Sequence, residues 1–150
     1  GNHEFISGIE ASEAFLAGTR VRLLRDDVES LPCGLQVIGR DDRSNPRRLS
    51  LEELLEKTDT SRPVLVLDHQ PYGLAQTGSL GIDMQVSGHT HRGQIWPLNW
   101  LTDAIYEQSH GYRKWENAHI YVSSGLSLWG PPFRIGTRSD MVVLKILHEE

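Results

Sequence analysis

Short apolar runs recur along the chain, and most are bounded by Gly, Pro, Asn or Asp. Runs of about four to eight residues between such turn residues are typical of β-strands. Val64–Leu67 is apolar at every position, as in a strand that is covered on both faces. The pattern predicts strands at residues 21–24, 35–38, 64–67, 82–86, 120–123 and 141–146.

Fewer segments carry the signals of a helix. Good helix formers followed by Gly18 predict a helix at residues 9–17. Ser50 and Glu53 form a capping box, which predicts a helix from there to about Lys57. Residues 40–48 are expected to form an exposed loop, and residues 96–116 an irregular excursion with one helical turn near 101–106. Because strands and helices are both present, the fold class is predicted to be α/β.

Histidines stand where the predicted strands end. His89 and His91 lie in Ser87-Gly88-His89-Thr90-His91-Arg92-Gly93-Gln94, directly after one strand, and His69 follows Val64–Leu67. Residues two apart on a strand share a face, so both imidazoles at one strand tip can aim at one point. Neutral imidazole is the commonest protein ligand for first-row metals, which makes this tip a candidate metal site. Asn2 and His3 offer further metal-capable groups on a third predicted loop.

Length and charge limit the remaining possibilities. A chain of 150 residues suits one domain, and a net charge of -5 gives no basic footprint for non-specific binding of nucleic acid. The single cysteine, Cys33, cannot form an internal disulfide. No apolar run reaches the roughly 20 residues of a membrane span. Because the chain opens on Gly1 without a Met, we expect it to be the later part of a longer protein, either cytoplasmic or membrane-associated through an upstream segment.

These motifs together resemble a known family. Gly1-Asn2-His3-Glu4, His69 and Gly88-His89-Thr90-His91 occur in the order of the last three motif blocks of the calcineurin-like metallophosphoesterase superfamily. Residues 68–71, 87–94, 123–126 and 129–134 are similar to the bacterial, often membrane-associated branch of that family. The resemblance covers most of the chain. It implies that residues 1–150 form a single, partial domain, the C-terminal portion of a four-layer α/β/β/α sandwich with mixed sheets.

The resemblance also implies a role for each motif residue. Asn2, His69 and His89 would bind one divalent metal ion, His91 would bind a second, and His3 would act beside the phosphate as a general acid. Two such ions, Mn, Fe, Zn or Co, would activate a bridging hydroxide for hydrolysis of a phosphoester. The favoured substrates are phosphodiester or pyrophosphate-linked small molecules or lipids.

The family pattern is incomplete in this chain. Asp-x-His and Gly-Asp-x-x-Asp, which supply most ligands of the other metal and the bridging carboxylate in the family, do not occur, and Asp41, Asp42 and Asp83 lack their context. We expect these blocks upstream, and weak metal binding and weak or no catalysis by the 150 residues alone. Two alternatives stay open. One is a non-catalytic metal-binding or interaction module, and the other is a mononuclear metallohydrolase using Asn2, His69 and His89.

Several further residues have weaker assignments. Arg92 and Arg134 are candidate substrate contacts because Arg recognises phosphate readily. Asp68 could orient a ligand histidine, although strand alternation points it away from His69. His110, His119 and His148 are expected to be surface or packing residues.

Overall fold

The computed structural model describes residues 1–147 as an α/β fold built on one mixed sheet. The strand order is β1-β2-β3-β4-β6-β5, in which β2, β3, β4 and β6 are parallel and the two edge strands are antiparallel to their neighbours. The strands are β1 (Asp27–Ser30), β2 (Gln36–Gly39), β3 (Val64–Leu67), β4 (Met84–Ser87), β5 (Gly111–Trp115) and β6 (Ala118–Val122). The predicted α/β class is confirmed.

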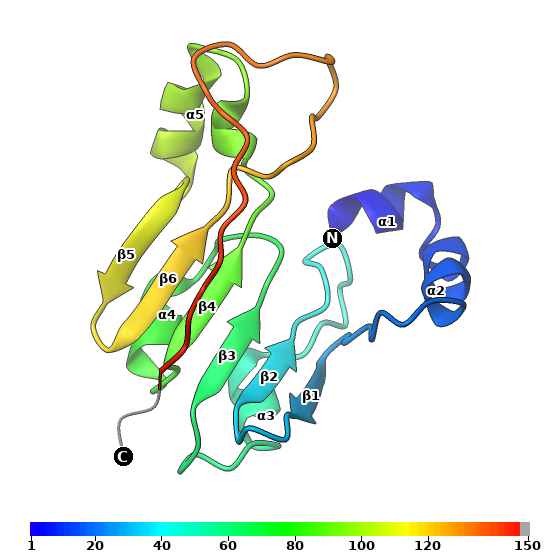
Figure 1. Cartoon of the computed structure of the whole chain (residues 1–150), viewed down its shortest axis with the longest axis vertical. Coiled ribbons are helices and arrows are strands. Elements are labelled where there is room, and N and C mark those ends of the chain that lie inside the picture. Colours follow the sequence, from blue (N-terminus) through cyan, green and yellow to red (C-terminus); the bar gives the residue numbers. More distant parts are fainter. Residues whose placement is uncertain (148–150) are drawn as a thin grey trace.

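Two helices, α3 (Leu51–Leu55) and α4 (Leu74–Ser79), cover one face of this sheet (Figure 1). The helices are α1 (Asn2–Ser7), α2 (Ile9–Ala17), α3 (Leu51–Leu55), α4 (Leu74–Ser79), the 3-10 turn η1 (His91–Gly93) and α5 (Leu98–Ile105). Leu51 and Leu54 of α3 pack on Ile38 and Val66 in one core cluster, and Leu74 of α4 packs on β6 in a second. Within residues 1–147, no helix combines the length and the apolar character needed to cross a membrane.

The opposite face of the sheet is covered only by extended chain. Residues 141–147 run across it in front of β4 and β6 (Figure 1), and Tyr121 and Ser123 both donate hydrogen bonds to Asp140 at the start of this segment. The strand predicted at 141–146 is therefore wrong. Both edges of β6 are already paired, with β4 and β5, so no open edge remains there for this apolar segment to join.

The strand predicted at 21–24 is also wrong, because the strand in this region is β1. Val28 of β1 pairs with Ile38 of β2 and occupies the edge that residues 21–24 would need. The chain before β1 instead packs against Gly39. A Cβ atom added at Gly39 would overlap the Leu24 side chain, so only glycine permits this approach.

The other predicted elements are close to those observed. The helix at 9–17 matches α2, and the Ser50–Glu53 capping box opens α3, which ends at Leu55 rather than Lys57. The strand at 35–38 is β2 shifted by one residue, and that at 120–123 is the later part of β6. The prediction of an irregular excursion at 96–116 is wrong, since this region contains α5 and the hairpin strand β5, but the helical turn expected near 101–106 overlaps the end of α5.

Helix α4 has no signal in the local sequence, because its stabilising contact comes from a distant residue. The Glu107 carboxylate accepts hydrogen bonds from the main-chain N–H groups of Gly73, Leu74 and Ala75 at the first turn of α4. A carboxylate at a helix N-terminus satisfies N–H groups that have no partner within the helix and complements the helix dipole. The contact depends on a residue 32 to 34 positions away, so local patterns could not reveal it.

Candidate active site

Three separate segments meet at the carboxyl ends of the parallel strands. His69 follows β3, His89 follows β4, and Asn2 lies in the first turn of α1, which approaches the sheet at this end (Figure 1). Asn2 and His3 were expected on a loop, but both belong to this short helix. Gly1 allows the close approach, because a Cβ atom at that position would lie 2.6 Å from the His69 ring.

Three metal-capable atoms form a small triangle there. Nε2 of His69 lies 3.0 Å from Oδ1 of Asn2, and Nδ1 of His89 lies 3.2 Å from the same oxygen. The two imidazole nitrogens are 3.2 Å apart. We call Asn2, His69 and His89 the trio.

These separations fit the donor set of one cation. Donor atoms about 2.1 Å from a first-row metal ion are themselves about 3.0–3.4 Å apart in octahedral or tetrahedral geometry. Imidazole nitrogen with amide oxygen suits Mn, Fe, Co or Zn. Within residues 1–147, no group of three His, Cys, Asp or Glu side chains is placed to hold a metal ion. The trio is not such a group, because its third donor is the amide oxygen of Asn2.

The backbone that presents the histidines is strained. β4 ends at Ser87, and His89, His91, Arg92 and Gln94 all have positive φ, between 48° and 69°. Non-glycine residues in this region are uncommon and cluster at functional sites. Strand alternation therefore does not set the direction of the two imidazoles, contrary to the sequence-based argument. His89 joins the trio, whereas the His91 ring lies against Gly125 and next to Arg134.

The trio histidines favour the neutral state. Burial lowers the pKa of His69 to about 4, helped by His89, and burial also lowers the pKa of His89. The Asp42 carboxylate opposes both shifts. Burial, then the positive charge of Arg134, lowers the pKa of His91. A neutral imidazole keeps a free lone pair, which is the form that binds a metal ion.

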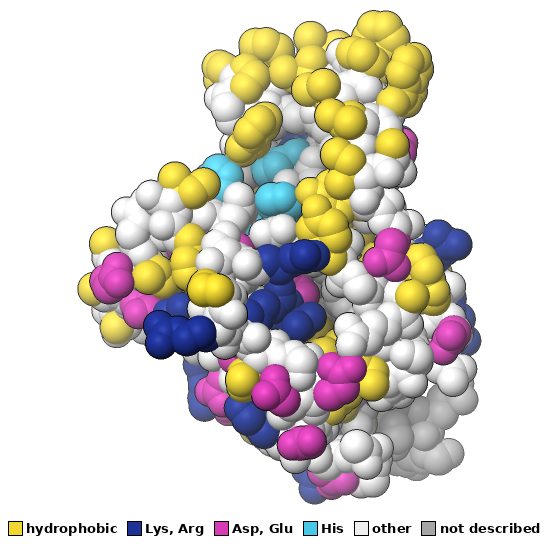
Figure 2. Space-filling view, turned by 180° about the vertical axis from the view of Figure 1, so that it is seen from behind, with side chains coloured by type: hydrophobic (Ala, Val, Ile, Leu, Met, Phe, Trp, Pro, Cys, Tyr) yellow, Lys and Arg dark blue, Asp and Glu magenta, His cyan; other side chains and the backbone are white. Residues whose placement is uncertain are grey.

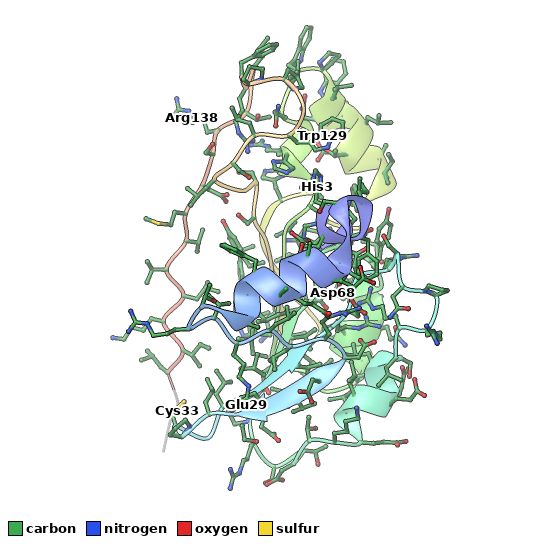
Figure 3. All side chains as sticks on the ribbon, turned by 90° about the vertical axis from the view of Figure 1, so that its right-hand side faces the viewer. His3, Glu29, Cys33, Asp68, Trp129 and Arg138 are labelled. Atoms are coloured by element: carbon green, nitrogen blue, oxygen red, sulfur yellow. The ribbon has the colours of Figure 1, made fainter. Side chains whose placement is uncertain are left out.

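The histidines line a cavity of about 350 Å³ whose opposite wall is apolar. We call it the histidine pocket. His3 lines it as an exposed side chain and lies between Trp129 and Asp68 in the view of Figure 3. The apolar wall consists of Leu98, Leu101, Ile105, Tyr106 and Trp129, from α5 and the loop after β6. Figure 2 shows hydrophobic side chains directly above the histidines.

Comparison with known proteins places the chain in a family. It is 35% identical to an uncharacterized metallophosphoesterase of Helicobacter pylori (strain J99) over 98% of its length, and 31% identical to one of Aquifex aeolicus over 97%. The chain belongs to the metallophosphoesterase family. The predicted family is thereby confirmed. The chain spans 41% of the Helicobacter relative and 58% of the Aquifex relative.

The family is not confined to bacteria. A transmembrane protein with metallophosphoesterase domain from Bos taurus is 35% identical over 99 residues, which are 64% of this chain and 22% of that protein. No family model matches this metallophosphoesterase, and no solved structure does.

The two arginines proposed as substrate contacts are placed differently. Arg92 is not among the residues that line the histidine pocket. The Arg134 guanidinium donates to the main-chain carbonyls of His91, Ser124, Gly125 and Ser127, and thereby ties the loop after β6 to the histidine loop. Contact of either arginine with substrate stays a prediction.

Asp68 does not orient a ligand histidine. Its Oδ2 atom accepts hydrogen bonds from Arg40 and Arg48, on the side of β3 away from His69. Burial raises the pKa of Asp68 against the opposing pull of both guanidinium groups. Asp68 and His69 thus have different partners, as expected of side chains that point away from each other, although both residues follow the end of β3.

Sequence reasoning missed two supporting residues. Asp42 was set aside, yet it is buried, accepts hydrogen bonds from Ser44 and Gln70, and acts electrostatically on the trio histidines. Gln94 is buried and bridges to the main chain of Trp129, Pro131 and Phe133. Gln94 thus holds the apolar wall beside the site. Its place at the end of the histidine motif was the only available signal.

The remaining histidines stay outside the site. The Nδ1 atoms of His110 and His119 lie within hydrogen-bonding distance of Ser109 and Tyr112 respectively, consistent with the packing or surface roles expected of them. His148 lies outside the described residues.

Proposed function

We propose that this metallophosphoesterase chain carries part of a two-metal centre that hydrolyses phosphoester bonds. The observation that carries the proposal is the trio, in which three donor atoms from three chain segments converge within 3.2 Å of one another. An imidazole N–H can donate a hydrogen bond to the Asn2 oxygen at these distances, and the same three atoms also match the donor set of one divalent ion. The family relationship supports phosphoester hydrolysis as the reaction.

Each residue has a proposed task. Asn2, His69 and His89 hold one divalent ion, and His91, across the same pocket, contributes to the second. When bound, two such ions lower the pKa of a shared water and offset charge on the phosphate oxygens. His3 lines the same cavity with an exposed imidazole, where it donates a proton to the leaving alkoxide. Arg92 and Arg134 are proposed as additional contacts to the substrate.

The apolar wall indicates the substrate class. A cavity with donor atoms on one side and Leu98, Leu101 and Ile105 on the other suits a phosphodiester or pyrophosphate-linked molecule with an apolar part, such as a lipid. A lipid substrate would place the protein at a membrane. The name of the Bos taurus relative, a transmembrane protein, agrees with this proposed membrane association.

The test is hydrolysis by the full gene product that contains these 150 residues. With Mn²⁺ present, we expect it to cleave a generic phosphodiester, and we expect His89→Ala to reduce kcat/KM at least 100-fold. His119→Ala is the matched control, because His119 lies on β6 outside the histidine pocket. Full activity after EDTA treatment, or in His89→Ala, would overturn the proposal, as would metal binding without hydrolysis of any phosphoester.

A further inference from the structure

A second cavity lies on the helix-covered side of the sheet, and its walls are rich in arginine. It measures about 540 Å³ and is lined by the 40–48 loop, the start of α3 and the chain after β3. We call it the arginine pocket, after Arg40, Arg43 and Arg48, which line it with Asp68 and Tyr72. In Figure 2 cationic side chains gather in a hollow below the histidines.

The positive charge of this pocket is only partly balanced. Arg40 and Arg48 share a single carboxylate oxygen, Oδ2 of Asp68. Arg43 forms no ion pair with any residue in the described part of the chain, and Glu53, the other acid on the wall, accepts a hydrogen bond from the Ser50 main chain. Two of the three guanidinium groups thus share the Asp68 carboxylate, and Arg43 is the guanidinium on the wall without an ion-pair partner in the described residues.

Arg40 and Arg48 are mostly buried, whereas Arg43 is exposed and stacks on Tyr72. The Arg48 side chain is 9% exposed and that of Arg40 is 15% exposed. Burial, then the charge of Arg48, lowers the pKa of Arg40, and the carboxylates of Asp68, Asp26 and Glu52 oppose this shift. Arg43 lies 4.0 Å above the centre of the Tyr72 ring. Ordered guanidinium groups bind phosphate oxygens with little loss of side-chain entropy.

We propose that the arginine pocket binds a phosphate group. The cavity is large enough for a phosphate with an attached group, since ligand pockets typically measure about 300–1,000 Å³. Two sources fit this chemistry: free inorganic phosphate, or a second phosphate of a substrate that also reaches the histidine pocket.

The second source is geometrically reasonable because the two pockets share a wall. Tyr72 lines the arginine pocket and Tyr106 lines the histidine pocket, and their ring centres are 5.0 Å apart. Tyr106 in turn lies 6.2 Å from the His89 ring. Only this second source rests on the proposed function.

Arg43→Gln tests the pocket, and Arg47→Gln is the matched control. Both arginines are exposed on one loop, and each substitution removes one positive charge. Arg47 is the control because it is not among the residues that line the pocket. Binding of inorganic phosphate is measured by calorimetry on the EDTA-treated full gene product. We expect Arg43→Gln to weaken binding at least fivefold and Arg47→Gln to change it less than twofold. Absence of saturable binding by the wild-type protein, or equal losses in both variants, would overturn the proposal.

Steady-state kinetics then separate the two sources. A substrate phosphate predicts that Arg43→Gln raises KM for a pyrophosphate-linked substrate and leaves KM for a simple phosphodiester unchanged. Free phosphate predicts that both KM values stay unchanged while phosphate binding is weakened. Either result supports phosphate binding in the arginine pocket. Because calorimetry is done without metal, failure of hydrolysis would count against the proposed function and leave the binding result intact.

Discussion

The histidine pocket and the arginine pocket lie on either side of one strand end, and their chemistry is opposite. The first brings together uncharged donor atoms, two imidazole nitrogens and an amide oxygen, which attract a cation. The second brings together guanidinium groups around one shared carboxylate, which leaves positive charge for an anion. A metal-dependent phosphoesterase needs sites for both charges, because it binds metal cations and an anionic substrate.

The difference arises from two consecutive residues. Asp68 and His69 follow β3 and point to opposite sides, so one carries a charge into the arginine pocket and the other a neutral ligand into the histidine pocket. Two neighbouring residues after the end of β3 thus serve the two different pockets. We therefore expect substitutions at Asp68 mainly to lower the free energy of unfolding, and substitutions in the trio mainly to weaken metal binding.

The largest effect is expected from Asp68→Asn. Removing the carboxylate leaves Arg40 and Arg48 as buried charges without an anion, and breaking a buried pair in this way costs about 3–5 kcal/mol. Urea unfolding measures the loss. Glu29→Gln is the control, because its partner Arg22 is exposed and such surface pairs contribute about 0–1 kcal/mol. A loss below about 1 kcal/mol for Asp68→Asn would contradict a charge-balancing role.

Gln94→Ala tests how firmly the apolar wall is held beside the histidines. The variant removes the side chain that bridges Trp129, Pro131 and Phe133 and leaves main-chain groups without a partner. We expect a loss of about 2 kcal/mol in the free energy of unfolding and faster proteolysis near residues 126–135. Gln76→Ala, which loses an exposed bond to Glu52, is expected to change little. Similar stability of the two variants would count against the bridge.

Acid should destabilise the metal-free protein through His69. The folded-state pKa of about 4 lies below the ordinary value of 6.5, so the unfolded state binds more protons between these limits. The free energy of unfolding therefore falls as the pH drops from about 6.5 to 5, by about 1–1.5 kcal/mol for this group. Urea unfolding at both pH values measures it, and His69→Gln should flatten the dependence. An unchanged slope in His69→Gln would show that another group is responsible.

The smallest effect is expected from Leu101→Ser on the apolar wall. Leu101 is 55% exposed and lines the histidine pocket, so its loss removes apolar contact with a substrate but little folding energy. We expect KM for a phosphodiester with an acyl chain to rise about threefold, and KM for a short phosphodiester to stay unchanged. Phe15→Ser, on α2 and 74% exposed, is the control. If Leu101→Ser changed KM by the same factor for both substrates, the argument for a lipid substrate would be removed.

The sequence predicted the four central strands approximately and the histidines that follow β3 and β4, because apolar runs and strand-end histidines are local patterns. The parallel pairing of these strands was not predicted. Its errors have a common cause. Residues 141–146 look like a strand, but the sheet offers them no edge there, and α4 depends on Glu107, far away in the chain. The arginine pocket was predicted only as an exposed loop, since the pairing of Arg40 and Arg48 with Asp68 joins positions 28 and 20 residues apart.

Titration with Co²⁺ tests the central claim most directly, because the visible absorption of the ion reports its ligands. We expect one weakly bound ion per chain of 150 residues, lost in both His69→Ala and His89→Ala and retained in His119→Ala. Binding that survives His89→Ala, or no binding by the wild-type chain, would contradict the assignment of the trio as a metal site.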